Sequence, residues 1–181
     1  MPSKALLACA FGALLFTNAA RATIGLAEWS VSTPGAHLVC SQDPFKAEHG
    51  VCLRTSDKSG QGEVGRVWVS KIQWWQYYKG AVAGECARGH FLFEEKSHQL
   101  SYVPTEVALK SLIKGLPAPK PLTRRITPED GWKLANGPFL RALIEQRRRS
   151  PEFKQLSKAQ QSALDHEAQR LNPPDLRPLP E

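Results

Sequence analysis

The amino-acid pattern changes abruptly at Pro104, and this change constrains the fold more than any other feature of the chain. Residues 26–103 hold short runs of β-branched and aromatic residues between turn residues, which is typical of strands. After Pro104, apolar residues recur every three or four positions, which is typical of amphipathic helices. The connections between the predicted strands are too short for parallel crossovers. The sequence therefore predicts an α+β fold, with a small antiparallel β-sheet (a meander) followed by a helical C-terminal subdomain.

The densest aromatic stretch, residues 66–79 (RVWVSKIQWWQYYK), fits both a strand and a helix. Its aromatic content and the flanking Gly65 and Gly80 favour a strand. Strict alternation places Trp68, Ile72, Trp74 and Tyr78 on one face, and Val67, Val69, Trp75 and Tyr77 on the other. Aromatic residues would then lie on both faces of the sheet. Either the C-terminal helices bury them, or they form an aromatic surface for sugar rings or a partner, with these candidate residues: Trp74, Trp75, Tyr77 and Tyr78.

The helical half divides into several predicted segments. Residues 23–116 should form the sheet region plus one packing helix, which begins after Thr105 as N-cap and ends at Gly115. Residues 117–126 read as a basic linker stiffened by prolines. Residues 127–171 should hold the helical subdomain, with one helix ending at Asn136-Gly137, a second opening at Pro138 and a third from Lys158. The third has few apolar residues, so it either packs loosely or completes its burial on another protein. Residues 172–181 should be a disordered Pro-rich tail.

The first 22 residues are typical of a cleaved signal peptide. Lys4 precedes an uncharged apolar run from Ala5 to Phe16, and Ala20-Arg21-Ala22 fits the cleavage pattern. The run is too short for a membrane anchor, which needs about 20 residues. A lipoprotein signal ending at Cys9 is the competing interpretation, but it leaves too short an apolar region. We expect a periplasmic or secreted protein that begins at Thr23.

Cysteine usage fits an oxidising compartment. Cys40 and Cys52 each lie in a short apolar run, and a polar loop joins the runs, so these two should form a disulfide across a hairpin. Cys86 is left over as the one candidate nucleophile, because His90 or His98 could activate its thiol. No recognised nucleophile motif surrounds it. His49-x-x-Cys52 and Cys86-x3-His90 have ligand-like spacing, yet thiolate zinc does not suit an oxidising compartment, so no metal and no cofactor is expected.

The positive charge is concentrated. The formal net charge is +7, and residues 120–151 hold eight of the 24 Lys and Arg residues against three acids. Such a run is either a solvated face or a patch that binds an anionic membrane surface, a cell-wall polymer or an acidic protein. No nucleic-acid motif accompanies it, so nucleic acid is not an expected partner. The candidate patch residues are Arg124, Arg125, Arg141, Arg147, Arg148 and Arg149.

These features favour one function over two others. A thin amphipathic helix, a Pro-rich tail and a localised basic patch, without a recognised catalytic constellation, favour a non-catalytic binding or assembly component of a bacterial cell envelope. That interpretation implies a protein partner in the envelope. The alternatives are a small exported enzyme that uses Cys86 with His90 or His98, and a secreted inhibitor or immunity-type protein. The sequence does not separate the binding component from the secreted inhibitor or immunity-type protein.

Overall fold

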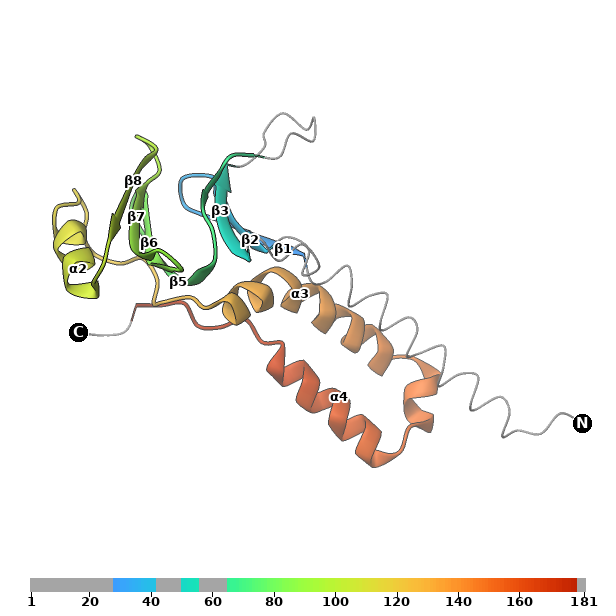
Figure 1. Cartoon of the computed structure of the whole chain (residues 1–181). Helices are drawn as coiled ribbons and strands as arrows, with labels where there is room; N and C mark the ends of the chain where they lie inside the picture. The colour runs from blue at the N-terminus through green and yellow to red at the C-terminus, as the bar shows by residue number, and fades with distance from the viewer. Residues whose placement is uncertain (1–27, 42–49, 56–64, 179–181) are drawn as a thin grey trace, which may run out of the picture.

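A computed structural model of the 181-residue chain describes residues 28–41, 50–55 and 65–178. The predicted signal peptide and His49 lie outside these ranges. The described part contains eight strands, three α-helices and one short 3-10 helix. The α+β prediction, with strands first and helices in the C-terminal half, is confirmed (Figure 1).

The strands form two antiparallel four-stranded sheets rather than one. The first sheet contains, in order, β1 (Trp29–Ser32), β2 (His37–Ser41), β3 (Val51–Thr55) and β4 (Val67–Val69). The second contains, in order, β5 (Ile72–Tyr78), β6 (Ala81–Cys86), β7 (Gly89–Glu94) and β8 (Gln99–Val103). Every pair of neighbours is consecutive in the chain, so each sheet is a meander as predicted.

The stretch 66–79 is β-structure as expected, but it is not one strand. The chain leaves the first sheet after Val69 and enters the second at Ile72, and Lys71 between them has a left-handed φ of 56°. A register shift between Ile72 and Trp74 follows. The predicted alternation holds for Trp74 and Tyr78 on one face and for Val69, Trp75 and Tyr77 on the other. It is wrong for Ile72 and Trp68, which lie with the core of Trp75 instead of on the face of Trp74.

Apolar side chains from both sheets meet in one core. Val39, Leu53 and Val69 come from the first sheet, and Phe91 and Phe93 from the second, all nearly or fully buried. Two sheets that bury one face each against the other form a sandwich. The opposite face of the second sheet carries a smaller apolar cluster, and a helix covers it (Figure 1).

That covering helix is α2 (Glu106–Lys114), and its predicted boundaries are confirmed. The Thr105 hydroxyl caps its first turn by accepting from the Ala108 N–H at 3.2 Å. Leu109 is buried against the sheet, and the chain leaves the helix at Gly115. The N-cap and the apolar stripe therefore explain why this segment forms a helix. The packing of the helix shields the second apolar cluster from solvent.

The segment 117–126 is not a free linker, because it pairs with the edge of β5. The Leu122 N–H donates to the Tyr77 carbonyl at 2.8 Å, and Trp75 and Ile126 exchange two backbone hydrogen bonds of 2.9 and 2.7 Å. Ile126 is fully buried. The connector therefore closes the edge of the second sheet and fixes the start of the next helix.

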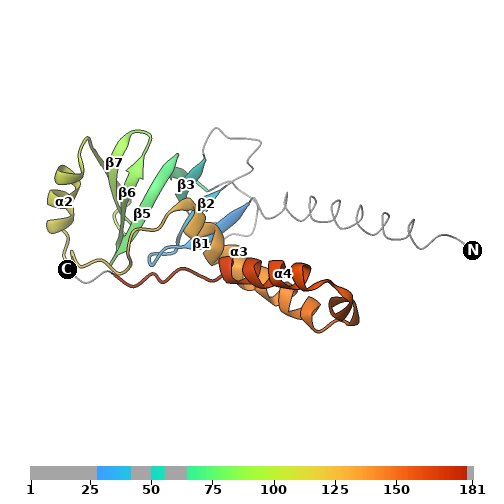
Figure 2. The same ribbon diagram turned by 90° about the horizontal axis from the view of Figure 1, so that it is seen from below.

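The next helix, α3 (Pro128–Arg148), is continuous through Asn136-Gly137-Pro138, so the prediction of two helices there is wrong. It is followed by the 3-10 helix η2 (Pro151–Gln155) and by α4 (Lys158–Arg170). A Cβ on Gly137 would lie 2.6 Å from the Leu171 carbonyl oxygen. The glycine is therefore a close-packing position at the base of the helix pair, and not a terminator. The α3–α4 hairpin projects away from the sheets (Figures 1 and 2).

The chain then returns toward the sandwich. Leu171 is buried, Leu176 packs against the main core, and the Arg124 N–H donates to the Leu176 carbonyl at 2.9 Å. The expectation of a disordered tail is therefore wrong for residues 172–178, and residues 179–181 lie outside the described part. The segment that precedes the hairpin and the segment that follows it are therefore hydrogen-bonded to each other beside the main core.

Candidate functional site

The structure does not bring the candidate nucleophile and the histidines together. In the β6–β7 register, Cys86 lies opposite Gly89 and Glu85 lies opposite His90. Because neighbouring residues on a strand point to opposite faces, Cys86 and His90 lie on different faces of the sheet. Cys86 is buried in the core between the sheets, whereas the His90 Nε2 lies 4.0 Å from the Glu85 carboxylate. His98 follows the far end of β7, about 17–20 Å of strand away.

Cys40 and Cys52 lie directly opposite each other on β2 and β3, as a disulfide would require. Both are buried, and their sulfurs are 3.5 Å apart without a bond between them. The hydrogen bond from Cys52 lowers the pKa of Cys40, and nearby Arg54 lowers it further, while the same contact raises the pKa of Cys52. The disulfide stays a prediction. Among the described residues, no group of three or more His, Cys, Asp or Glu could hold a metal ion; His49 is outside them.

A buried polar cluster that the sequence did not indicate joins the two sheets. The Thr33 hydroxyl donates to Glu95 and accepts from the His37 N–H at 2.9 Å. The His37 Nδ1 lies 3.4 Å from the same carboxylate. Gly35 is packed so closely on this carboxylate that a Cβ there would lie 2.5 Å from its carbon. The cluster fastens the β1–β2 turn to the β7–β8 turn, and its burial makes it a structural contact between sheets.

The expected aromatic surface is wrong for three of its four residues. Trp75, Tyr77 and Tyr78 are buried, in agreement with the alternative that the fold covers them. Trp74 is partly exposed, and its indole N–H donates to Glu85 at 2.7 Å while the Arg125 guanidinium covers its ring at 4.2 Å. One face of the indole and its N–H are therefore occupied within the molecule.

Most of the candidate arginines are engaged in intramolecular contacts. Two hold the connector: Arg124 binds Asp130 at 3.1 Å, and Arg125 binds Glu106 at 2.6 Å. The others lie on α3 and beside its end, where Arg148 binds Glu145 and Asp165, Arg149 binds Glu145, and Arg141 donates to Asn172. Arg147 is exposed. Much of the basic run thus holds the hairpin and its base together.

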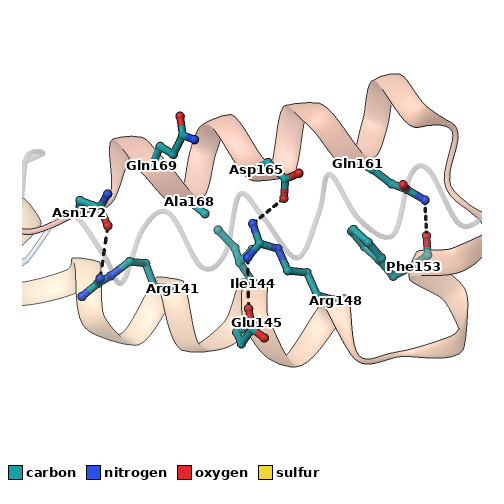
Figure 3. A pocket seen from close by; sticks show the side chains of 10 residues that line it. All are labelled: Arg141, Ile144, Glu145, Arg148, Phe153, Gln161, Asp165, Ala168, Gln169 and Asn172. Carbon is teal, nitrogen blue, oxygen red and sulfur yellow. Dashed lines mark hydrogen bonds and ion pairs between the residues drawn. The ribbon is translucent and has the colours of Figure 1, made fainter.

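The hairpin has almost no buried interior. From Pro138 to Arg170, a stretch that the structure describes in full, no residue is buried. A groove of about 730 Å³ separates α3 from α4, and Ile144, Phe153 and Ala168 are among its lining residues. Figure 3 shows polar contacts bridging it: Arg148 to Asp165 at 2.5 Å, Arg141 to Asn172 at 3.3 Å, and Gln161 to the Phe153 carbonyl at 3.2 Å.

Two large apolar side chains on α3 face solvent. Phe139 is 59% exposed and Leu143 is 45% exposed, and they lie one turn apart on the helix. We call this pair the hairpin face. Large exposed apolar side chains grouped on a projecting element mark interaction sites more often than isolated ones do. The i, i+4 spacing of the two residues can be seen in the sequence, but the exposure of their side chains cannot.

Comparison with known proteins adds no relative. No protein-family model matches the chain, and no curated protein and no solved structure matches it. Within residues 28–41, 50–55 and 65–178, none of the helices has both the length and the apolarity needed to cross a membrane.

Proposed function

We propose that this protein is a non-catalytic binding component that uses the α3–α4 hairpin as its contact arm. The observation that carries the proposal is the absence of any buried residue over 138–170, described throughout, together with the exposed hairpin face. An amphipathic helix gains most of its stability from burying its apolar stripe. A helix pair that buries so little by itself gains that burial on a partner.

The partner is a protein with an apolar groove that receives Phe139 and Leu143. This is the helix-in-groove mode, in which residues at i and i+4 act as anchors. Burial of one Phe or Leu side chain is worth about 1.5–3 kcal/mol, so two anchors suffice for a specific contact. The alternative of an exported enzyme gains no support from Cys86, which lies apart from His90 and His98.

Site-specific crosslinking tests the contact. A photoreactive phenylalanine analogue at position 139 should form one discrete adduct in the cells that make the protein, and the same analogue at position 122 should not. Leu122 is the matched control because it is 48% exposed and lies on the connector rather than on the hairpin. An adduct pattern shared by the two positions would show non-specific exposure and would contradict the proposal.

Binding loss separates the contact from stability. Phe139→Ser with Leu143→Ser should reduce binding to the captured protein by about 1000-fold, since two anchor residues at about 2 kcal/mol each cost about 4 kcal/mol together. The melting temperature should hardly change, because both side chains are exposed. Leu122→Ser, at an exposed apolar residue of the connector, should leave binding intact. Unchanged binding in the double variant would remove the hairpin from the function.

We also propose export to the envelope of a bacterial cell, periplasmic or secreted, with cleavage after Ala22. The support is the apolar run followed by Ala20-Arg21-Ala22. N-terminal sequencing of protein recovered from the envelope fraction or medium should return Thr23 as the first residue. Recovery from the cytoplasm with Met1 in place would refute export while leaving the hairpin contact open. A secreted inhibitor remains the second candidate, because the same arm could bind a target enzyme.

A further inference from the structure

A second surface, remote from the hairpin face, lies where α2 meets the connector. A groove of about 1090 Å³ opens there, with walls from α2, from the connector and from the returning C-terminal segment. Its volume is at the upper end of the range for small-molecule pockets, so it has room for a larger ligand. The lining residues are Tyr78, Val107, Lys110, Ser111, Ile113, Lys114, Pro119, Lys120, Pro121 and Pro178.

The helix α2 has two faces with different tasks. Leu109 and Leu112 of the helix, with Leu116 just beyond its end, pack with the second sheet. Four other residues, Val107, Lys110, Ser111 and Lys114, follow the spacing i, i+3, i+4, i+7 and line the groove. This second face therefore lines the groove with two lysines, one serine and one valine. The sequence carries this spacing.

The charge of the groove has one sign. Three of the ten lining residues are lysines and none is acidic. Lys110 has a partner outside the lining, Glu106 at 3.1 Å, whereas Lys114 and Lys120 form no ion pair within the described residues. Both are exposed. A groove whose lining carries three lysines and no acidic residue attracts an anionic ligand.

The remaining lining is apolar or rigid. Val107 is 75% exposed, Tyr78 is buried at the side of the groove, and three prolines complete the wall. Proline side chains lose little freedom when a ligand covers them. A compact inorganic anion would use only the lysines. An extended peptide that alternates acidic and apolar side chains would use both the lysines and the apolar wall.

We infer that this groove binds an extended acidic segment of a partner protein. Carboxylates of the segment meet Lys110, Lys114 and Lys120, and its apolar side chains cover Val107 and the prolines. The inference goes beyond the proposed hairpin contact, because it assigns a second binding site on the sandwich with different chemistry.

The probe is a fluorescein-labelled peptide of alternating glutamate and valine, about six residues long and roughly 20 Å when extended. Fluorescence anisotropy measures its binding to the mature protein at low salt and at about 0.15 M salt. Lys114→Gln with Lys120→Gln should weaken binding by about 2- to 30-fold, since each exposed pair contributes a modest amount. The matched control, Lys154→Gln with Lys158→Gln, removes the same charge from exposed lysines on the hairpin and should bind normally.

Four outcomes would overturn the inference: equal weakening in the control variant, equal binding of a glutamine–valine peptide, no peptide binding at low salt, or lysine-dependent retention on anionic phospholipid vesicles without peptide binding. The last would make the groove a membrane contact. NMR amide shifts should map the bound peptide to α2 and residues 117–121. The Phe139→Ser, Leu143→Ser variant should bind the peptide normally, so failure of the hairpin proposal and failure of this one are distinguishable.

Discussion

Replacing Gly131 by alanine tests how the hairpin is held to the sandwich. Gly131 lies in the first turn of α3, and an added Cβ would meet Trp29 ring atoms at 2.5 and 2.7 Å and the Trp75 ring at 2.7 Å. The two indoles are stacked with centroids 6.1 Å apart, and Trp75 is fully buried. Normal carbon–carbon contacts are about 3.5–4.0 Å, so the overlap is about 1 Å against walls that cannot swing away.

Two effects of opposite sign decide the magnitude. The higher helix propensity of alanine should raise the free energy of unfolding by about 1 kcal/mol relative to glycine. Overpacking costs about 1–3 kcal/mol, and an overlap of this size against two rings belongs in the upper part of that range. We expect a net loss of about 1–2 kcal/mol, which for a chain of this length lowers the melting temperature by about 2–8 °C.

Thermal unfolding followed by circular dichroism measures the shift. Ala142→Gly, on the exposed part of the same helix, calibrates the intrinsic propensity and should cost about 1 kcal/mol. Trp29→Phe removes the outer ring atoms that the new Cβ meets, so Gly131→Ala should be better tolerated in that background. The reasoning fails if Gly131→Ala stabilises the protein by the full helix propensity, or if the double-mutant cycle with Trp29→Phe shows no coupling.

Two further predictions concern buried groups of the sandwich. Burial raises the pKa of Tyr77 from 10 to about 12, with the nearby Glu95 carboxylate adding to the rise, so up to about 2.7 kcal/mol of stability should be lost as the pH increases from 10 through 12. Tyr77→Phe should reduce this alkaline loss in denaturant titrations, and an unaltered pH profile would contradict it. For the cysteines, peptide mapping without reduction should recover Cys40 linked to Cys52 with Cys86 unpaired; a major species with Cys86 in a bridge would be the contrary result.

The sequence predicts those parts of the fold that form for local reasons. Strands appear where β-branched and aromatic residues alternate, and α2 appears where Thr105 supplies a cap to an apolar stripe. The break between β4 and β5 was not predictable, because Lys71 adopts a left-handed φ without being glycine. The helix end predicted at Gly137 was also wrong. The glycine is needed there because the Leu171 carbonyl packs against it across the hairpin, and it does not end the helix.

The candidate site was harder to predict because charge partners are set by tertiary structure. The sequence located the arginines, yet Arg125 meets Glu106 nineteen residues away and Arg148 meets Asp165 seventeen away. Burial of Trp75 likewise depends on Trp29 and α3 covering it. For the residues from Val107 to Lys114, the helical spacing could be seen in the sequence. The groove that they line could not, because the connector and the C-terminal segment form its other walls.

The hairpin should be less stable than the sandwich because it buries less apolar surface. The base of the hairpin is fixed by Gly131 against the stacked indoles, by the Arg124–Asp130 pair and by the return of Leu176 to the core. Beyond Gly137, none of residues 138–170 is buried, so their apolar and polar contacts are at least partly open to solvent. Local opening free energies follow buried apolar contact. Amide exchange should therefore quicken from the base of α3 toward Ser150, and a bound partner should slow it most where the free hairpin buries least.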